Sequence, residues 1–455
     1  MSILISGISG VRGLIGDGFD ADVVKVYTRA FAQLMNKGKI VIAQDSRPSG
    51  AMFKGVVEDT LSRLGCEIID CGICPTPTAQ LMVKQLNAKG GIIVTASHNP
   101  IEWNALKFVG AEGLFLDSEE HKLLQIELAK VRQAAPLNSE RSGQVTHLDD
   151  RIERHIENVI ALDLVNVEAI RKRRPKVVID AINGAGSEAL PAFLERIGCE
   201  VFPINCDNDG NFVHTPEPLP ENLMGLRNEV SRRGADIGIA TDPDADRLAV
   251  IDEYGKPLVE EYTLVLAAYH ALRHAAEGDR RPIVTNLSST MALDDLAQRY
   301  NRKVLRTPVG EIHVARKMQQ IDSLIGGEGN GGVILAESHL GRDSLVASGL
   351  ILSLLAESGQ SIREIANDLP RYEMVKDKIN VQGYEPGDIL KALAEKYASL
   401  SPNLEDGVKI SWKDRWVHFR ASNTEPIVRI FAEGSSQTVA ASLVKEFKTE
   451  IQNLM

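Results

Sequence analysis

Cysteine is scarce in this sequence, with five residues in a chain of 455. They are Cys66, Cys71, Cys74, Cys199 and Cys206. An odd number in a long chain without a secretion signal argues against a disulfide framework. Cys71 and Cys74 have redox-motif spacing, but no second Cys or His cluster accompanies them, as a zinc site would need. We therefore expect all five to be core or loop residues.

Long apolar runs are missing as well. The sequence contains no stretch of about 18 apolar residues, the length that a membrane-spanning helix needs. The N-terminal segment Met1 to Gly7 has neither the basic lead nor the long apolar core of a signal peptide. We expect no membrane association and a cytoplasmic location.

The sequence also has no excess of positive charge. Lys and Arg number 51 against 62 Asp and Glu, which gives a formal net charge of −11. Bulk electrostatic attraction to nucleic acid is therefore disfavoured, and we expect no nucleic-acid partner. A few local cations can still hold a small phosphorylated molecule. We interpret the basic run 171–174 as a solvated lead-in to a buried strand.

What the chain does have is length and a regular alternation of elements. A single hydrophobic core does not support 455 residues, so roughly three or four domains are expected. Up to about residue 370, apolar β-branched runs alternate with segments of helical periodicity, and afterwards the order changes. The pattern predicts an α/β fold: three similar α/β units with mixed sheets at 1–150, 151–256 and 257–370, then a smaller α+β domain at 371–455.

The stretch 90–100 is the first candidate for chemistry. Its first half is apolar and β-branched, as in a strand buried in a parallel sheet, and it ends in Ser97-His98-Asn99-Pro100. Ser97 is therefore predicted just past the carboxyl end of a strand, where open α/β sheets bind ligands and expose nucleophiles. Taken alone, the same residues are more typical of a Ser-capped turn.

A second candidate follows another predicted strand. Asp242, Asp244 and Asp246 alternate, so on an extended segment their carboxylates would project to one side and offer the oxygen ligands that Mg²⁺ prefers. Arg247 stands where a calcium-binding EF-hand loop needs glycine, so calcium is disfavoured. An acidic loop in water is the plain alternative.

These stretches resemble two loops of the α-D-phosphohexomutases, the superfamily of phosphoglucomutase, phosphomannomutase and phosphoglucosamine mutase. Thr95–Pro100, with Asn104 and Lys107, is similar to the phosphoserine loop, and Asp242–Arg247 to the metal loop. Three more segments resemble, in order, the N-terminal substrate loop, the sugar-binding loop and the phosphate-binding loop: Gly7–Gly13, Gly327–Gly332, and Arg420–Pro426 with Arg429. The resemblance spans nearly the whole chain.

The resemblance implies transfer of phosphate between the 1 and 6 positions of a hexose, through phosphorylated Ser97 and a sugar 1,6-bisphosphate. It implies four domains around a central cleft, a Mg²⁺ ion, a small sugar phosphate as partner, and a monomer or homodimer. The implied catalytic residues are Ser97, His98, Lys107, Arg12 and Arg247, and the implied metal ligands are Ser97, Asp242, Asp244 and Asp246. The implied substrate-binding residues are Arg47, Thr307, Gly310, Glu328, Asn330, Arg420, Ser422, Asn423, Thr424 and Arg429.

Two residues compete for the role of general base. Lys107 stands at the distance from Ser97 at which the family carries a lysine, but an ammonium must lose its proton to act as a base. That requires burial or cationic neighbours, for which Arg12, Arg47 and Arg247 are candidates. His98 is the alternative.

The sequence departs from many relatives in ways that leave the sugar open. Asn330-Gly331-Gly332 replaces Ser-Gly-His, Pro243 replaces a glycine of the metal loop, and Ala105 replaces a glycine after Asn104. Archaeal-type relatives look more like this variant. Glucose, mannose and glucosamine phosphates remain candidates, with phosphoglucosamine mutase as the alternative activity. A sugar phosphatase and a non-catalytic sugar-phosphate-binding protein are two further alternatives.

Overall fold

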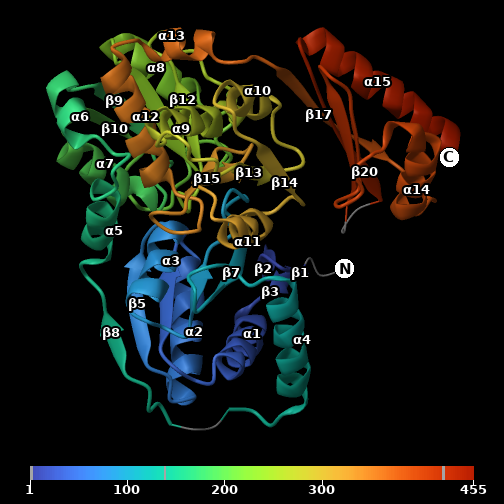
Figure 1. Cartoon of the computed structure of the whole chain (residues 1–455). Helices are drawn as coiled ribbons and strands as arrows, with labels where there is room; N and C mark the ends of the chain where they lie inside the picture. Colours follow the sequence, from blue (N-terminus) through green and yellow to red (C-terminus); the bar gives the residue numbers. More distant parts are fainter. Residues whose placement is uncertain (1–3, 138–139, 423–425) are drawn as a thin grey trace. The chain divides into compact units, whose positions relative to one another are not determined.

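The computed structural model describes residues 4–137, 140–422 and 426–455 (Figure 1). The chain forms two compact units. The first comprises Met1–His274 and Asn330–Ile365, and the second comprises Ala275–Gly329 and Ala366–Met455. Each unit is described separately.

The first unit begins with a mixed sheet in the order β1-β2-β7-β6-β4-β5-β8, with β3 beside β2. Its strands are β1 (Leu4–Gly7), β2 (Gly10–Ile15), β3 (Gly18–Phe19), β4 (Ile40–Gln44), β5 (Ile68–Ile73), β6 (Gly90–Val94), β7 (Trp103–Gly110) and β8 (Val145–His147). Strand β6 is parallel to β4 and antiparallel to β7, and all its residues are buried. The strand that leads to Ser97 therefore lies in the interior of the sheet.

The helices of this domain are α1 (Ala21–Leu34), α2 (Gly50–Arg63), α3 (Thr76–Gln85) and α4 (Ser118–Gln133). Helices α1, α2 and α4 share one hydrophobic core with the sheet, in which Phe31 stacks on Phe108. Both α1 and α4 begin at an aspartate, Asp20 and Asp117, whose carboxylate accepts from backbone N–H groups of the first turn. Helix α3 packs against β4 and β6.

A second sheet in the same unit has the order β10-β9-β11-β12. Its elements are α5 (Arg151–Ile160), α6 (Val167–Arg173), β9 (Lys176–Asp180), α7 (Gly186–Ile197), β10 (Glu200–Ile204), α8 (Met224–Arg233), β11 (Ile237–Thr241) and β12 (Leu248–Ile251). Strands β9, β10 and β11 are parallel, and β12 is antiparallel to β11. The basic run 171–174 ends α6, which the sequence did not predict, and it is mostly exposed as expected. Cations suit the carboxyl end of a helix.

The remaining elements of this part are α9 (Glu261–His274), β16 (Gly332–Leu335), α12 (Ser344–Ser358) and α13 (Ile362–Asp368), the last of which runs into the second unit. Helix α9 packs on α12, and α12 is buried on every side from Ser344 to Leu355. The five cysteines are free, three of them buried and two partly so, which confirms the prediction that they are core or loop residues.

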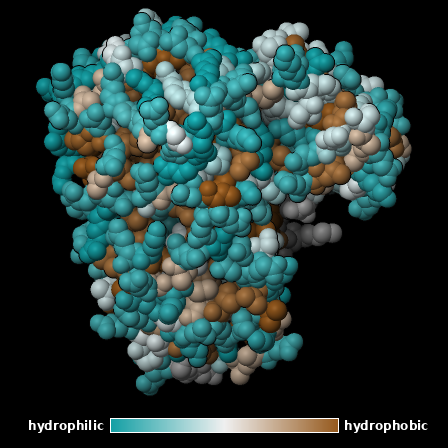
Figure 2. Space-filling view, in the orientation of Figure 1, coloured by the Kyte–Doolittle hydropathy of each residue, from teal (hydrophilic) through white to brown (hydrophobic). Residues whose placement is uncertain are grey.

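Hydrophilic residues surround scattered apolar ones on the face drawn in Figure 2. Within the described ranges, no single helix is long and apolar enough to cross a membrane. One bent pair, Ser344–Ser358 with Ile362–Asp368, meets the test by length and composition alone.

The second unit contains the parallel strands β14, β13 and β15, in that order. The elements are β13 (Ile283–Asn286), α10 (Ala292–Arg299), β14 (Val304–Thr307), α11 (Glu311–Ile321) and β15 (Ile325–Glu328). The same unit includes an antiparallel sheet in the order β17-β20-β19-β18, whose core includes residues of α14 and α15. These elements are β17 (Glu373–Asn380), α14 (Pro386–Lys396), the 3-10 helix Ala398–Leu400, β18 (Val408–Ser411), β19 (Trp416–Ala421), β20 (Ile427–Gly434) and α15 (Gln437–Leu454).

Buried polar contacts join the C-terminal sheet to residues 287–291 of its own unit. Glu433 accepts from the Met291 N–H (2.8 Å), and Lys409 Nζ donates to the Leu287 carbonyl (2.6 Å). The fold class is thus as predicted, with three α/β domains and an α+β domain at the carboxyl end. The domain boundaries and the central cleft stay predictions.

Candidate active site

The backbone at Ser97 is strained and held in place by neighbouring side chains. Ser97 has φ +50°, a left-handed conformation that a residue with a Cβ rarely adopts. Its N–H donates to Thr95 Oγ1 (3.0 Å), and that hydroxyl donates to Asp45 Oδ2 (2.6 Å). The residue is 8% exposed. The end of β6 thus presents the Ser97 hydroxyl in a fixed, mostly enclosed position.

The side chain of Arg47 is bonded within the loop that carries Ser97. Its side chain is fully buried and bonds to Asp45 (2.8 Å) and to the carbonyl oxygens of Ser97 (2.8 Å) and Trp103 (2.7 Å). The guanidinium therefore ties the Ser97 loop together. That Arg47 binds substrate stays a prediction.

The three aspartates converge as predicted, but the backbone does so by turning. Asp242, Asp244 and Asp246 are at most 1% exposed, and each offers a carboxylate oxygen within 4.8 Å of the others. The segment is not extended, because the Ala245 N–H donates to the Asp242 carbonyl (3.0 Å) and Ala245 has φ +53°. A turn after β11, with one left-handed residue, gathers the carboxylates.

Two carboxylate oxygens of this group are available to bind a cation. Asp242 Oδ2 accepts from the Ser97 hydroxyl (2.9 Å), and Asp244 Oδ2 accepts from Lys107 Nζ (2.6 Å) and Thr76 Oγ1 (2.7 Å). The buried Oδ1 atoms of Asp244 and Asp246 have no hydrogen-bond partner among the described residues. Burial and the charges of Asp246 and Asp244 hold the pKa of Asp242 well above its usual range. Unpaired buried carboxylate oxygens are what a bound divalent ion would satisfy.

The surroundings of Lys107 are anionic. Its Nζ lies 2.6 Å from Asp244 and 3.7 Å from Asp246. Burial alone would lower the pKa of Lys107, but these two carboxylates outweigh it and raise the pKa. The charge of Arg342 also lowers the pKa of Lys107, but the net shift is upward and not downward as expected. Lys107 carries its proton.

His98 is neutral by contrast. Its Nδ1 lies 3.3 Å from the Ser97 hydroxyl. Burial, and next the charge of Arg247, lower the pKa of His98 to about 3. Arg247 Nε itself lies 3.8 Å from Asp242 Oδ2 and from Asp246 Oδ1. The exposed Arg12 on β2 reaches Asn99 Oδ1 (3.5 Å), so it lies beside the same loop.

Arg342 belongs to this group and was not predicted. It is 7% exposed, and its Nη2 donates to Asp246 Oδ2 (2.6 Å). Two residues on, the Ser344 hydroxyl donates to the Ala245 carbonyl (2.7 Å). Asp343 caps α12 between them. The start of α12 therefore holds the aspartate turn from one side. An aspartate just before an apolar helix was the available sequence signal.

We expect Arg342→Met to lower the free energy of unfolding by about 3 kcal/mol when a chelator is present, since it removes the shortest ion pair of the buried Asp246 carboxylate and leaves only the longer ones to Lys107 and Arg247. Excess Mg²⁺ should raise the free energy of unfolding of the variant by more than it raises that of the wild type. Urea unfolding with and without Mg²⁺ measures both. Arg363→Met, which breaks the half-exposed pair with Asp252, is the control and should show no such metal dependence. Equal Mg²⁺ effects in both variants would contradict this role.

In the second unit, Thr307, Gly310 and Glu328 lie at or just past the carboxyl ends of parallel strands. Glu328 ends β15 and is 4% exposed, and its Oε1 accepts from Asn286 Nδ2 (2.9 Å) and the Gly310 N–H (3.0 Å). Thr307 ends β14, and its hydroxyl donates to the Pro308 carbonyl (2.9 Å). Asn286 was not predicted. Asn330 belongs to the first unit, where its Oδ1 accepts from the Gly332 N–H (3.2 Å).

Two arginines of the predicted phosphate loop lie side by side on neighbouring strands. Arg420 on β19 and Arg429 on β20 are paired in register. Arg420 Nε lies 2.9 Å from Asp406 Oδ2, and Arg429 is exposed. Ser422 donates its N–H to the Ile427 carbonyl (3.1 Å). Asn423 and Thr424 lie outside the described residues.

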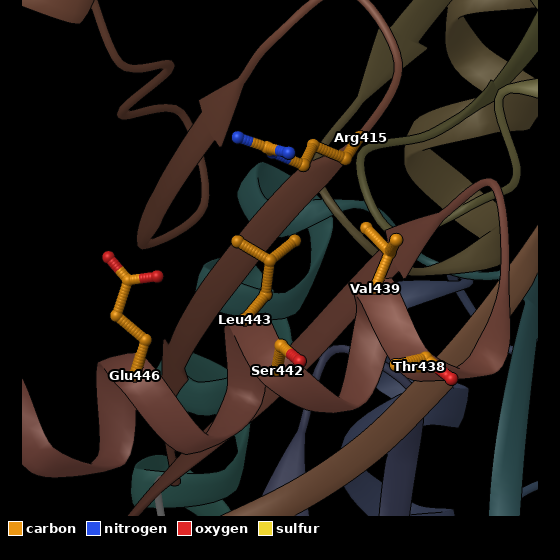
Figure 3. Close-up of a pocket in the computed structure, with 6 residues that line it drawn as sticks. All are labelled: Arg415, Thr438, Val439, Ser442, Leu443 and Glu446. Atoms are coloured by element: carbon orange, nitrogen blue, oxygen red, sulfur yellow. The ribbon is translucent and has the colours of Figure 1, made fainter.

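A pocket of about 210 Å³ lies elsewhere on the C-terminal domain, along α15 (Figure 3). Its lining residues are Arg415, Thr438, Val439, Ser442, Leu443 and Glu446. None of these is a predicted site residue, and the carboxylates, lysine and serine described above lie in the other unit. The pocket therefore shares no residue with the candidate active site.

Comparison with known families matches almost the whole chain. Models described as phosphoglucomutase/phosphomannomutase alpha/beta/alpha domain I, domain II and domain III match residues 4–135, 153–255 and 260–372. The model of the corresponding C-terminal domain matches residues 378–450.

Individual proteins are similar over the same extent. A Thermococcus kodakarensis protein named phosphoglucomutase/phosphomannomutase is 39% identical over 442 residues, 95% of each chain. A Sulfurisphaera tokodaii protein named phosphoglucosamine/phosphogalactosamine mutase is 33% identical over 451 residues, 98% of each chain. The solved structure of a phosphoglucomutase/phosphomannomutase family protein from Burkholderia thailandensis is 25% identical, with a TM-score of 0.83, and the match covers 99% of this chain and 98% of that one.

Proposed function

Because this chain belongs to the phosphoglucomutase/phosphomannomutase family, we propose that it is a phosphohexomutase that interconverts the 1- and 6-phosphates of a hexose. The observation that carries the proposal is the Ser97 hydroxyl, which lies 2.9 Å from one of three buried carboxylates and is held there by a strained, bonded loop. A serine phosphate at this position is the store of the phosphoryl group. The enzyme is an isomerase by its net reaction.

Two phosphoryl transfers make up the cycle. In the first, a sugar hydroxyl attacks the phosphorus on Ser97 and gives its proton to a base, while the bond between phosphorus and Ser97 Oγ breaks and Ser97 Oγ takes up a proton. The product is a sugar 1,6-bisphosphate. After the bisphosphate reverses, the Ser97 hydroxyl attacks the other phosphate of the sugar and loses its proton to a base. The bond between that phosphorus and the sugar oxygen breaks, and the sugar oxygen leaves with a proton. Protein groups contribute mainly position and charge in such transfers.

Asp242, Asp244 and Asp246, with an oxygen on Ser97, would hold the metal ion, and we propose Mg²⁺ because the donor set consists of oxygens alone. When bound, the ion would withdraw charge from the phosphoryl group. Lys107 and Arg247 place further positive charge beside the same carboxylates.

Two residues are candidates for the group that transfers the proton. Lys107 holds a proton that it can give to a departing oxygen, and its conjugate form would accept one in the reverse step. His98 is closer to the Ser97 hydroxyl, but a pKa of about 3 makes it a weak base. We therefore favour Lys107, with His98 as the alternative.

We assign binding of the sugar ring to Glu328 and, with it, to Thr307, Gly310 and Asn330. Glu328 Oε1 accepts from Asn286 Nδ2 and the Gly310 N–H, which fixes this acceptor-only carboxylate at the end of β15. The far phosphate is assigned to Arg420, Ser422, Asn423, Thr424 and Arg429. Asp406, which now pairs with Arg420, would give way to the dianion. A cytoplasmic monomer or homodimer, primed by a sugar 1,6-bisphosphate, completes the proposal.

Phosphoglucosamine mutase stays the second candidate function. The sugar loop reads Asn330-Gly331-Gly332, and several relatives near 30–34% identity carry the name phosphoglucosamine mutase. The protein named for glucose and mannose phosphates is more similar, at 39% identity. We therefore place glucose and mannose first.

An activity panel tests the proposal. The 1-phosphates of glucose, mannose, glucosamine and N-acetylglucosamine are supplied separately with Mg²⁺ and a trace of the matching 1,6-bisphosphate. We expect the 6-phosphate to form fastest from the glucose or mannose compound. Faster turnover of glucosamine 1-phosphate would establish the second candidate. Release of inorganic phosphate in place of the 6-phosphate would indicate a phosphatase, and binding without either product would overturn the assignment as an enzyme.

A further inference from the structure

Three side chains outside the reaction centre meet where α9 packs on α12 in the first unit. His270 and His274 lie one turn apart on α9, and Glu357 is near the end of α12. Each offers one ligand atom, and the three atoms lie within 4.8 Å of one another. None of these residues takes part in the chemistry proposed above.

The orientation of His270 is the first observation that points to a cation. Its Nε2 lies 2.8 Å from the Leu164 carbonyl, and because a carbonyl can only accept, Nε2 carries the hydrogen. Nδ1 therefore presents a lone pair. The residue is fully buried, and Nδ1 has no hydrogen-bond partner within the described residues. Glu357 Oε2 lies 4.0 Å from it. Two electron-pair donors thus face each other inside the protein.

The other two groups are oriented toward the same point. Glu357 Oε1 accepts from Asn166 Nδ2 (2.7 Å). This bond fixes the carboxylate so that Oε2 faces both histidines. His274 Nε2 lies 2.7 Å from Oε2, and its side chain is 39% exposed, which leaves a path to solvent. Metal-ligating histidines characteristically give their other ring N–H to a carbonyl, and ligating carboxylates are themselves hydrogen-bonded. His270 and Glu357 meet both conditions.

A buried histidine pair elsewhere in this unit shows what a purely structural arrangement looks like. His155 Nε2 and His339 Nε2 lie 2.7 and 2.9 Å from Asp343 Oδ2. Their Nδ1 atoms are also engaged, with the Thr78 hydroxyl (2.8 Å) and the Gly341 N–H (3.1 Å). Each ring nitrogen has a partner, so that cluster offers no lone pair. The contrast with His270 Nδ1 distinguishes the two.

We propose that His270 Nδ1, His274 Nε2 and Glu357 Oε2 bind a divalent transition-metal ion, Zn²⁺ by preference, that links α9 to α12. Two imidazole nitrogens and one carboxylate oxygen suit Zn²⁺, with water as a fourth ligand, and suit Mg²⁺ poorly. The ion would displace the proton now shared between His274 and Glu357. The site is distinct in ligand chemistry from the aspartate group.

Co²⁺ titration of the full chain tests the proposal, because Co²⁺ bound in a tetrahedral nitrogen and oxygen site absorbs visible light. The protein is first stripped with chelator and then kept in excess Mg²⁺ so that the aspartates are occupied. We expect one equivalent of Co²⁺ to give the tetrahedral spectrum and Zn²⁺ to displace it. His274→Gln and Glu357→Gln should each weaken binding by about 10-fold or more. Mutase activity in Mg²⁺ should be unchanged.

His147→Gln is the matched control, since His147 also lies beside a carboxylate, Asp70 (3.3 Å), but has no second histidine there. It should bind Co²⁺ as the wild type does. Zn²⁺ should also raise the thermal midpoint of the wild type and of the control, but not of the two site variants. Wild-type binding no tighter than that of His274→Gln and Glu357→Gln would overturn the site, as would loss of the spectrum only on Asp244→Asn.

Discussion

Ser97→Ala is expected to lower turnover by at least about 10³-fold while the protein stays folded, because the variant has no oxygen to carry the phosphoryl group between the two transfers. The fold should survive, since the interactions that hold the loop involve the backbone of Ser97 and the side chains of Thr95 and Arg47, not the serine hydroxyl. Only the 2.9 Å contact with Asp242 and the weaker one with His98 are lost.

Steady-state assays and intact-mass spectrometry measure the effect together. Part of the wild-type protein should be heavier by one phosphoryl group, and none of the variant should be. Ser46→Ala is the control: it removes a buried hydroxyl of the same domain that donates to the Asn183 carbonyl (2.7 Å), and it should keep both turnover and phosphorylation. A Ser97→Ala enzyme as active as the wild type would refute the phosphoserine scheme.

Asp244→Asn should remove most of the activity and the Mg²⁺ dependence together, with turnover reduced on the order of 10²-fold or more. Asp244 has two roles that the amide cannot fill. Its Oδ2 accepts from both Lys107 and Thr76, and its buried Oδ1 has no hydrogen-bond partner in the described chain. An amide nitrogen in either place would present hydrogens to a cation.

We would measure the rate as a function of Mg²⁺ concentration and follow metal binding by calorimetry. Together these measurements distinguish a metal site of lower affinity from one that is lost. Asp252→Asn is the control, because Asp252 is also buried in the second domain but pairs with Arg363 (2.7 Å) away from the aspartate turn. It should keep its response to Mg²⁺. If exhaustive chelation leaves the wild-type rate unchanged, the three aspartates are not catalytic metal ligands.

The sequence was most informative where chemistry follows the end of a strand. The strand before Ser97 and the one before Asp242 were both predicted, and each places its polar residues where the pattern put them. The convergence of the aspartates was predicted for an inexact reason, since the segment turns at Ala245 and is not extended. Residue alternation reports which side chains are available but not the backbone path that joins them.

What the sequence could not provide depends on contacts between distant residues. Helix α12 went unpredicted because it is buried on all sides, so no polar face marks its period. Arg342 lies 96 positions from Asp246, and nothing local to either residue indicates the pairing. The bonds of Arg47 to the Ser97 and Trp103 carbonyls could not be predicted either, because every residue carries a carbonyl oxygen.

The proposed site residues are divided between the two compact units, and this division has an evolutionary consequence. Ser97, Lys107 and the aspartate turn belong to one unit, whereas Glu328 and the paired arginines belong to the other. Mutations around Glu328 and the paired arginines can therefore accumulate in the second unit without disturbing the packing around the serine, whereas changes at Asn330 fall in the unit that holds Ser97. We expect related enzymes to have changed their sugar substrate by this route while keeping the residues for phosphoryl transfer. The glucose, mannose, glucosamine and galactosamine names among the relatives accord with such a history.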